Sequence, residues 1–78
     1  MAISIKLFAN FREGRGKIVQ MDYTPGMTGQ DVIDALGITA PEIAAIIVDG
    51  VDGKVDAMLT VPVKDGGYLA IFPPVAGG

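Results

Sequence analysis

Hydrophobic and polar residues alternate at the start of the chain. Ile3, Ile5 and Leu7 are separated by single residues of other types, a period of two that predicts a strand with one buried face. A second strand is predicted over residues 18–23, after a polar connection over residues 10–17 that contains two glycines. The first quarter of the chain therefore predicts a β-hairpin.

A helical signal follows this hairpin. Thr28 is a favoured N-cap residue, and Asp31 three positions later completes a variant of the capping box. Val32 and Leu36 then lie one helical turn apart, and Gly37 supplies a C-terminal stop. The pattern predicts one helix of about two to three turns, which depends on packing for its stability.

The second half of the chain predicts mostly strands. A single turn is expected over residues 40–43, followed by a buried strand over residues 45–48. Residues 49–54 contain two Asp-Gly pairs, and the pattern does not choose between them as the corner of a turn. A weaker strand is expected within residues 55–61, at a sheet edge because a proline follows. The last strand is predicted over residues 68–72, after a tight turn.

This order of elements predicts an α+β fold of the β-grasp (ubiquitin-like) type, in which a mixed sheet packs on one helix. The first and last strands are expected to lie parallel at the centre of the sheet. A ferredoxin-like split arrangement is the alternative, but the chain has no second helix of comparable length. We expect one domain over residues 1–72 and a flexible tail over residues 73–78.

Composition narrows the possible functions. With 78 residues, half of them hydrophobic, the chain can build one small core but has little room for a substrate cavity of several hundred cubic ångströms. A net charge of −3 and few aromatic residues disfavour nucleic-acid binding. No apolar run approaches the roughly 20 residues that span a bilayer, and the alternating start does not resemble a signal peptide. A cytoplasmic protein is the default expectation.

Cysteine and histidine are both absent from the sequence. Disulfides, cysteine nucleophiles and cysteine- or histidine-based metal sites are therefore excluded, together with the commonest general base. We expect no metal site and no catalysis by the chain alone. Any chemistry must use a different reactive group.

The C-terminal segment offers such a group. Two prolines direct the chain away from the last strand, and the small residues after them could thread a narrow channel and present the Gly78 carboxylate. The alternative is that the segment is an ordinary glycine-rich terminus without a function. The residues in question are Pro73, Pro74, Val75, Ala76, Gly77 and Gly78.

The ending Phe-Pro-Pro-Val-Ala-Gly-Gly, within residues 63–78, resembles that of the MoaD branch of the MoaD/ThiS sulfur carriers. Residues 3–13 are similar to the first strand of the same family, and residues 26–32 to its helix entry. The turn before the last strand departs from the family, where Asp-Gly-Asp-Glu is common, because this chain has Gly67-Tyr68 in place of the acidic pair. Which activating enzyme recognises the chain is therefore left open.

The resemblance implies a mechanism in which partner enzymes perform the catalysis. A MoeB/ThiF-like activating adenylyltransferase would use ATP and magnesium to adenylate the Gly78 carboxylate. Sulfur from a persulfide donor would then give a Gly78 thiocarboxylate, and a MoaE-like large subunit of molybdopterin synthase would receive it. No cofactor would be bound permanently, and neither nucleic acid nor membrane is an expected partner.

The resemblance also implies docking through an apolar patch on the open face of the sheet. If Ile3, Ile5 and Leu7 face the helix, Phe8 and Phe72 lie on the opposite surface of adjacent strands and form a candidate partner-binding site. The alternative is ordinary half-buried packing.

Two clusters of charged residues each have a functional and a simpler structural interpretation. Arg12, Arg15 and Lys17 could contact an acidic partner, but a solvated hairpin is favoured. The aspartates at positions 49, 52 and 56 resemble part of a calcium loop, but the full ligand pattern of such a loop is missing. Their interpretation as turn residues is therefore favoured.

Three functional hypotheses remain open. The first is a sulfur carrier, most simply for molybdenum or tungsten pterin synthesis, with thiamin synthesis, tRNA thiolation and cysteine synthesis as alternatives. The second is a ubiquitin-like modifier conjugated through Gly78. The third is a non-catalytic β-grasp interaction subunit with an inert tail.

Overall fold

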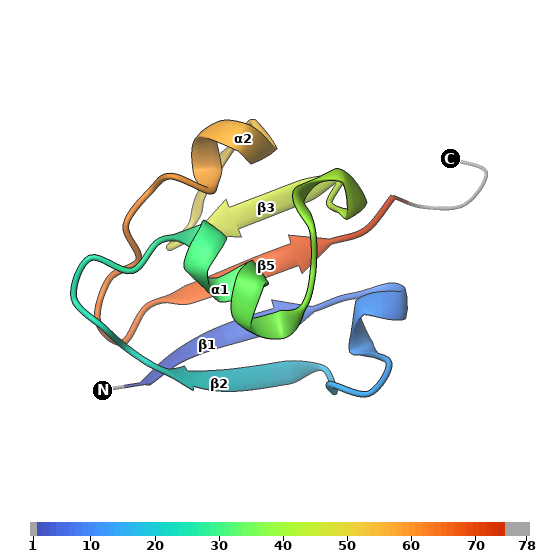
Figure 1. The fold of residues 1–78 in the computed structure, drawn as a ribbon, viewed down its shortest axis with the longest axis horizontal. Helices are drawn as coiled ribbons and strands as arrows, with labels where there is room; N and C mark the ends of the chain where they lie inside the picture. The colour runs from blue at the N-terminus through green and yellow to red at the C-terminus, as the bar shows by residue number, and fades with distance from the viewer. Residues whose placement is uncertain (1, 75–78) are drawn as a thin grey trace.

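The computed structural model describes residues 2–74, which form a five-stranded mixed sheet with helices packed on one of its faces (Figure 1). The strand order across the sheet is β2-β1-β5-β3-β4. In chain order the elements are β1 (Ala2–Leu7), η1 (Ala9–Arg12), β2 (Ile18–Asp22), α1 (Gly29–Leu36), η2 (Ala40–Glu42), β3 (Ala45–Val48), β4 (Val51–Gly53), α2 (Val55–Met58) and β5 (Tyr68–Phe72).

The predicted β-grasp fold is confirmed by the pairing of the two central strands. β1 and β5 run parallel, with Ile5 opposite Leu69, whereas β2 and β3 flank them in antiparallel pairings. A parallel pair requires a long crossover, and here the crossover contains α1, which covers the sheet.

The boundaries of α1 agree with the sequence signals. The Thr28 side chain accepts a hydrogen bond from the Asp31 backbone N–H, and the Asp31 carboxylate accepts one from the Thr28 N–H, which completes the capping box. At the other end Gly37 adopts a left-handed conformation with φ of 74°, which glycine accommodates without a steric penalty. Local chemistry therefore sets both ends of this helix.

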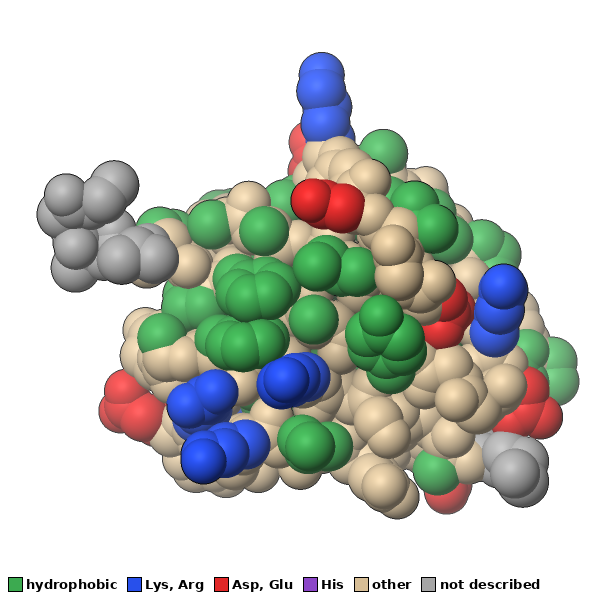
Figure 2. All heavy atoms as spheres, turned by 180° about the vertical axis from the view of Figure 1, so that it is seen from behind, with side chains coloured by type: hydrophobic (Ala, Val, Ile, Leu, Met, Phe, Trp, Pro, Cys, Tyr) green, Lys and Arg blue, Asp and Glu red, His purple; other side chains and the backbone are tan. Residues whose placement is uncertain are grey.

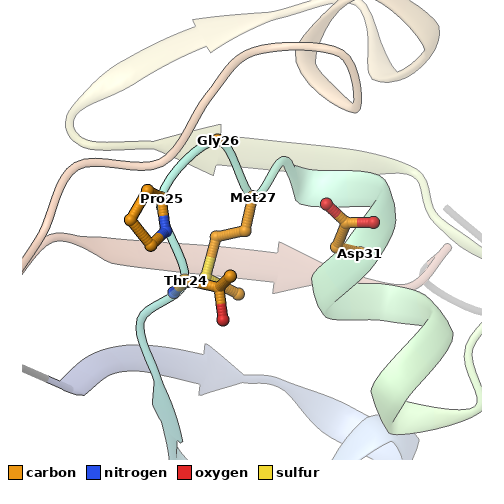
Figure 3. Close-up of a pocket in the computed structure, with 5 residues that line it drawn as sticks. All are labelled: Thr24, Pro25, Gly26, Met27 and Asp31. Atoms are coloured by element: carbon orange, nitrogen blue, oxygen red, sulfur yellow. Dashed lines mark hydrogen bonds between the residues drawn. The ribbon is translucent and has the colours of Figure 1, made fainter.

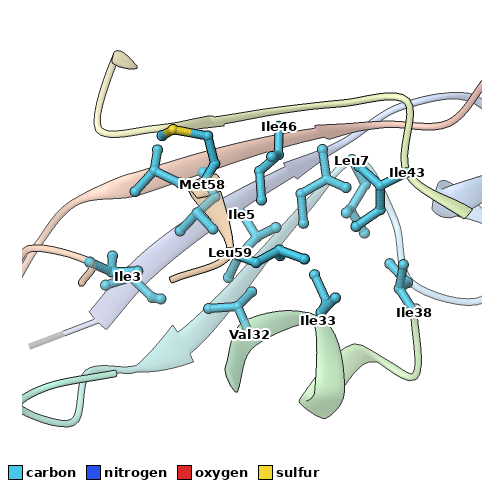
Figure 4. Close-up of a cluster of buried hydrophobic side chains, with 14 of the residues drawn as sticks. Ile3, Ile5, Leu7, Val32, Ile33, Ile38, Ile43, Ile46, Met58 and Leu59 are labelled. Atoms are coloured by element: carbon cyan, nitrogen blue, oxygen red, sulfur yellow. The ribbon is translucent and has the colours of Figure 1, made fainter. Parts of the chain in front are cut away.

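The hydrophobic core lies between the inner face of the sheet and the helices (Figure 4). Alternate residues of β1 point into it, because successive side chains on a strand face opposite sides. Removing these side chains from water is the main force that holds the helices on the sheet. The large side chains with less than 2% exposure are Ile3, Ile5, Leu7, Val32, Ile33, Ile46, Val48, Leu69 and Ile71.

The strand predicted within residues 55–61 is wrong, since this segment begins with the short helix α2. Alternate apolar residues suggested a period of two, but the buried side chains are Met58 and Leu59, three and four positions after the half-buried Val55. That spacing is helical, and the Leu59 N–H donates to the Val55 carbonyl as in an α-helix. The edge strand is β4 instead.

The choice between the two Asp-Gly pairs is resolved in favour of Asp49-Gly50. Both residues have positive φ, 49° and 84°, as a two-residue type I′ hairpin turn requires. Val48 and Val51 pair directly across this turn, so the second Asp-Gly pair lies inside β4. The register of the β3–β4 hairpin follows from the turn.

The connection between β1 and β2 is less solvated than the sequence predicts. Phe11, within η1, is buried and belongs to the core. Arg12 Nε donates to the Leu7 carbonyl at 2.8 Å, and Arg15 donates through Nε to the Leu36 carbonyl and through Nη1 to the Phe11 carbonyl, both at 3.1 Å. The two arginines therefore join this connection to β1 and to the end of α1, and the expectation of a solvated cluster is wrong for them.

Candidate functional site

The face of the sheet turned away from α1 exposes a group of hydrophobic side chains (Figure 2). Because Ile5 and Leu7 point into the core, Lys6 and Phe8 point to this outer face. The register places Ala70 beside Lys6 and Ile47 beside Ala70, which extends the apolar surface across β5 and β3. We call Phe8, Ile47, Ala70 and Phe72 the outer patch, in which Ala70 is buried and the other three are half-buried.

Phe8 and Phe72 form the centre of the outer patch. Their ring centroids are 4.1 Å apart and the ring planes differ by 13°, so the rings stack face to face. Both side chains are only half-buried. The structure thus brings together the two residues that the sequence singled out as partner-binding, while their binding role remains a prediction.

Two cations lie against the same aromatic pair. Lys6 Nζ lies 5.6 Å from the centroid of the Phe8 ring, and the Arg12 guanidinium carbon lies 5.4 Å from it. Both distances are within the range of a cation–π interaction. Because Arg12 also donates to the Leu7 carbonyl, its guanidinium is fixed next to the ring. Sequence analysis missed this role, because the contact of these two cations with Phe8, the residue after β1, depends on the tertiary structure.

The segment with the predicted reactive group leaves the sheet next to the outer patch. The Phe72 carbonyl accepts from the Ala44 N–H at 2.9 Å, so pairing with β3 continues to the end of β5. Pro73 is buried against the domain, and Pro74 is exposed. Val75, Ala76, Gly77 and Gly78, the remaining predicted tail residues, lie outside the described part of the chain.

The turn before β5 has Gly67-Tyr68 where an acidic pair was expected, and it is held by hydrogen bonds to the carboxylate of Asp49. Asp49 Oδ1 accepts from the Tyr68 N–H at 2.9 Å and Oδ2 accepts from the Lys64 N–H at 3.0 Å. Gly67 leaves room for this carboxylate, because a β-carbon at position 67 would overlap with it. Sequence analysis treated Asp49 only as a turn residue, and its contact with residues 15 to 19 positions away has no local signal.

A shallow hollow of about 340 Å³ lies on the other side of the molecule, between the β2–α1 connection and the start of α1 (Figure 3). Met27 is buried beneath it, and its sulfur accepts from the Thr24 N–H at 3.2 Å. Asp31 at its edge is already engaged in the capping box. The other lining residues, Pro25 and Gly26, carry no reactive group, so the hollow has no catalytic set.

The acidic residues do not form a metal site in the described region. Between residues 2 and 74 no group of three or more carboxylates is arranged to hold a metal ion, and the suggested calcium loop is therefore not formed.

The environment of Glu42 favours its ionised form. Hydrogen bonds from the backbone and the hydroxyl of Thr39, with a smaller contribution from Arg15, lower the pKa of Glu42 below its ordinary value of 4.5.

None of the helices within residues 2–74 is long and apolar enough to cross a membrane.

Comparison with known proteins gives one family and a set of similar folds. The sequence model of the ThiS family matches residues 5–78. None of the curated proteins compared with the chain matches it.

Among solved structures, small archaeal modifier protein 1 of Haloferax volcanii is 26% identical, with a TM-score of 0.73 and full coverage of both chains. The corresponding protein of Methanosarcina acetivorans is 23% identical, with a TM-score of 0.71, over 99% of this chain and 96% of that chain. A Pyrococcus furiosus protein described as subunit 1 of a molybdopterin converting factor is 22% identical, with a TM-score of 0.69, over 96% of this chain and 99% of that one. The last two likenesses show the shared β-grasp fold alone.

Proposed function

The chain belongs to the ThiS family of small ubiquitin-like carrier proteins, and from this premise we propose that it carries sulfur as a thiocarboxylate on Gly78. The observation that carries the proposal is the extent of the family match, which continues through the glycine pair to residue 78. The fold gives this segment a rigid base, because Phe72 is held in a central strand and Pro73 is buried beside it.

The chemistry follows from the weakness of a carboxylate as an electrophile. The Gly78 carboxylate attacks the α-phosphorus of ATP on an activating adenylyltransferase, which releases pyrophosphate and leaves an acyl-adenylate. A persulfide sulfur then attacks the acyl carbon and AMP departs. A thiol then attacks the donor's sulfur in the resulting acyl disulfide, which forms a new disulfide with the donor and releases the thiocarboxylate. The chain itself supplies the reacting carboxylate and the surface that the partner enzymes recognise.

We assign the outer patch as the surface that these partners recognise. Two half-buried phenylalanines on an open sheet face provide apolar area that a partner can cover. Phe72 is two residues before the exposed Pro74, so a partner bound at the patch lies at the base of the tail. Molybdopterin synthesis is the proposed destination of the sulfur, with a MoaE-like large subunit as the receiving partner.

A second candidate function is protein modification through Gly78. It is favoured by the 26% identity to small archaeal modifier protein 1, a protein named as a modifier. The two functions share the adenylation step and differ in the final nucleophile, which is sulfur for the carrier and a lysine amine for the modifier.

Intact-mass spectrometry of the protein from its native host tests the proposal. We expect a species in which one oxygen is replaced by sulfur, which disappears when Gly78 is deleted. Covalent conjugates of higher mass in place of that species would favour the modifier. The free acid alone, after incubation with the activating enzyme, ATP, magnesium and a persulfide donor, would rule out the carrier. The folding of the Gly78 deletion variant serves as the control.

A further inference from the structure

From the outer patch and its flanking cations, we infer that this face recognises a protein surface on which carboxylates surround an apolar contact. The inference rests on the proposed function, because it specifies the chemistry of the surface by which the activating enzyme holds its carrier. It goes beyond that function by assigning electrostatic recognition to Lys6 and Arg12.

The first observation is the uneven distribution of charge along the chain. Residues 1–21 contain four of the six Lys and Arg residues but only one of the nine acids. β1 and the connection after it are therefore cationic in a protein whose net charge is −3. Figure 2 shows Lys and Arg side chains gathered along one flank of the exposed hydrophobic group. A positive region on an acidic protein orients it towards an anionic partner during encounter.

The second observation is that these cations have no internal carboxylate partner. Within residues 2–74, neither Lys6 nor Arg12 has a carboxylate oxygen within 4.0 Å. Their recorded contacts are with the Phe8 ring and, for Arg12, the Leu7 carbonyl. Their positive charge is thus free to pair with an external anion.

The third observation separates a protein partner from a nucleic acid. Phe72 covers one face of the Phe8 ring at 4.1 Å, so the two cations over Phe8 must lie on the other face. Proteins that bind single-stranded nucleic acid stack bases on free aromatic faces. The Phe8 ring therefore has no free face on which a base could stack, and the cations beside it suit a protein surface that carries carboxylates.

These features define a docking surface with two parts. The rings and the neighbouring Ile47 give apolar contact, while the cations set the orientation of the partner. Lys6 is the better probe of the second part, because its side chain is exposed and makes no hydrogen bond to the fold. Arg12 also anchors backbone, so its replacement would alter the fold as well as the charge.

The experiment measures binding of the full chain to the ThiF/MoeB-type activating adenylyltransferase encoded in the same genome. Association and dissociation rates are recorded by biolayer interferometry at several salt concentrations for wild type, Lys6→Gln and Lys6→Glu. Lys54→Glu is the matched control, because it makes the same change in net charge beyond β4, at the far edge of the sheet. Adenylation of the wild-type chain by saturating enzyme is measured separately.

We expect Lys6→Glu to weaken binding by about tenfold or more, mainly through slower association, and to flatten the salt dependence. Lys6→Gln should have a smaller effect, and Lys54→Glu should stay within about twofold of wild type. Equal effects of Lys6→Glu and Lys54→Glu would overturn the inference, as would no binding by the wild-type chain. Tight binding of tRNA or self-association that depends on Lys6 would also overturn it, since the occupant would then be different.

Adenylation separates this inference from the proposed function. Wild-type chain that binds in a Lys6-dependent manner but is not adenylated supports the docking surface and refutes the carrier. Wild-type chain that is adenylated but binds independently of Lys6 supports the carrier and refutes the docking surface.

Discussion

The Asp49 carboxylate occupies the space that a β-carbon at Gly67 would need. Its two oxygens accept hydrogen bonds from backbone N–H groups on both sides of Gly67, those of Lys64 and Tyr68. One side chain from the β3–β4 turn thereby holds the turn that starts the central strand β5. The missing side chain at position 67 is what allows this contact.

Substitution of Gly67 with alanine should therefore destabilise the fold. A β-carbon at this position would overlap with the Asp49 carboxylate and lie 2.9 Å from the Lys64 carbonyl oxygen. We expect a loss of about 1–3 kcal/mol in the free energy of unfolding, measured by urea denaturation. In an Asp49→Gly background the same substitution should cost less, because only the clash with the carbonyl remains. Equal costs in both backgrounds would contradict the assigned contact.

The stacked rings of Phe8 and Phe72 should stabilise each other. We expect Phe8→Ala and Phe72→Ala each to lower stability, and the double variant to lose less than the sum. A coupling of about 0.5–1.5 kcal/mol is typical of aromatic pairs. Chemical denaturation of the four proteins measures this coupling, and a Tyr68→Ala variant controls for the loss of an exposed aromatic residue. Additive effects would show that the rings do not interact in solution.

Arg15 should not be replaceable by lysine. Its guanidinium donates to two carbonyls at once, those of Phe11 and Leu36, and an ammonium on a flexible stem does not reproduce that fork. We expect Arg15→Lys to cost about 0.5–1.5 kcal/mol of stability although charge is preserved. Lys17→Arg, on the same connection, is the control and should be nearly neutral. Unchanged stability of Arg15→Lys would mean that the two hydrogen bonds contribute little.

Glu42 should make a pH-dependent contribution to stability. Folding lowers its pKa below 4.5, so the folded state binds this proton more weakly than the unfolded chain. The contribution is therefore fully present above about pH 4.5 and disappears as the pH falls through the lower pKa of the folded state.

Thermal unfolding of wild type and Glu42→Gln between about pH 2 and pH 7 tests this prediction, because this range spans the titration of carboxylates. Wild type should be the more stable protein at neutral pH, and the difference should shrink on acidification. A difference that is constant with pH would argue against the hydrogen bonds from Thr39.

The sequence by itself determined the elements whose signals are local. The alternation of Ile3, Ile5 and Leu7 defined the buried face of β1, because successive strand residues face opposite sides. Thr28, Asp31 and Gly37 defined the ends of α1, since the capping groups lie within a few residues of the backbone that they satisfy. The order of these elements was enough to predict the β-grasp fold.

The tertiary structure decided whatever depends on contacts between distant residues. The segment after β4 alternates like a strand, yet burial of Met58 and Leu59 on the same side made it helical, and a periodicity argument alone does not reveal which side chains the core accepts. The pairing of Asp49 with the β5 turn and of Arg15 with the end of α1 likewise joins residues more than a dozen positions apart.

The candidate site also has one part that the sequence predicted and another part that only the tertiary structure decided. Sequence patterns selected Phe8 and Phe72 as residues of one surface, because each lies one position out of phase with buried neighbours. Their stacking, and the cations over Phe8, required the parallel pairing of β1 and β5, which brings positions more than sixty residues apart into contact. The sequence predicted that these two strands are neighbours, but the geometry of the rings and cations depends on side-chain packing, so only the tertiary structure decided it.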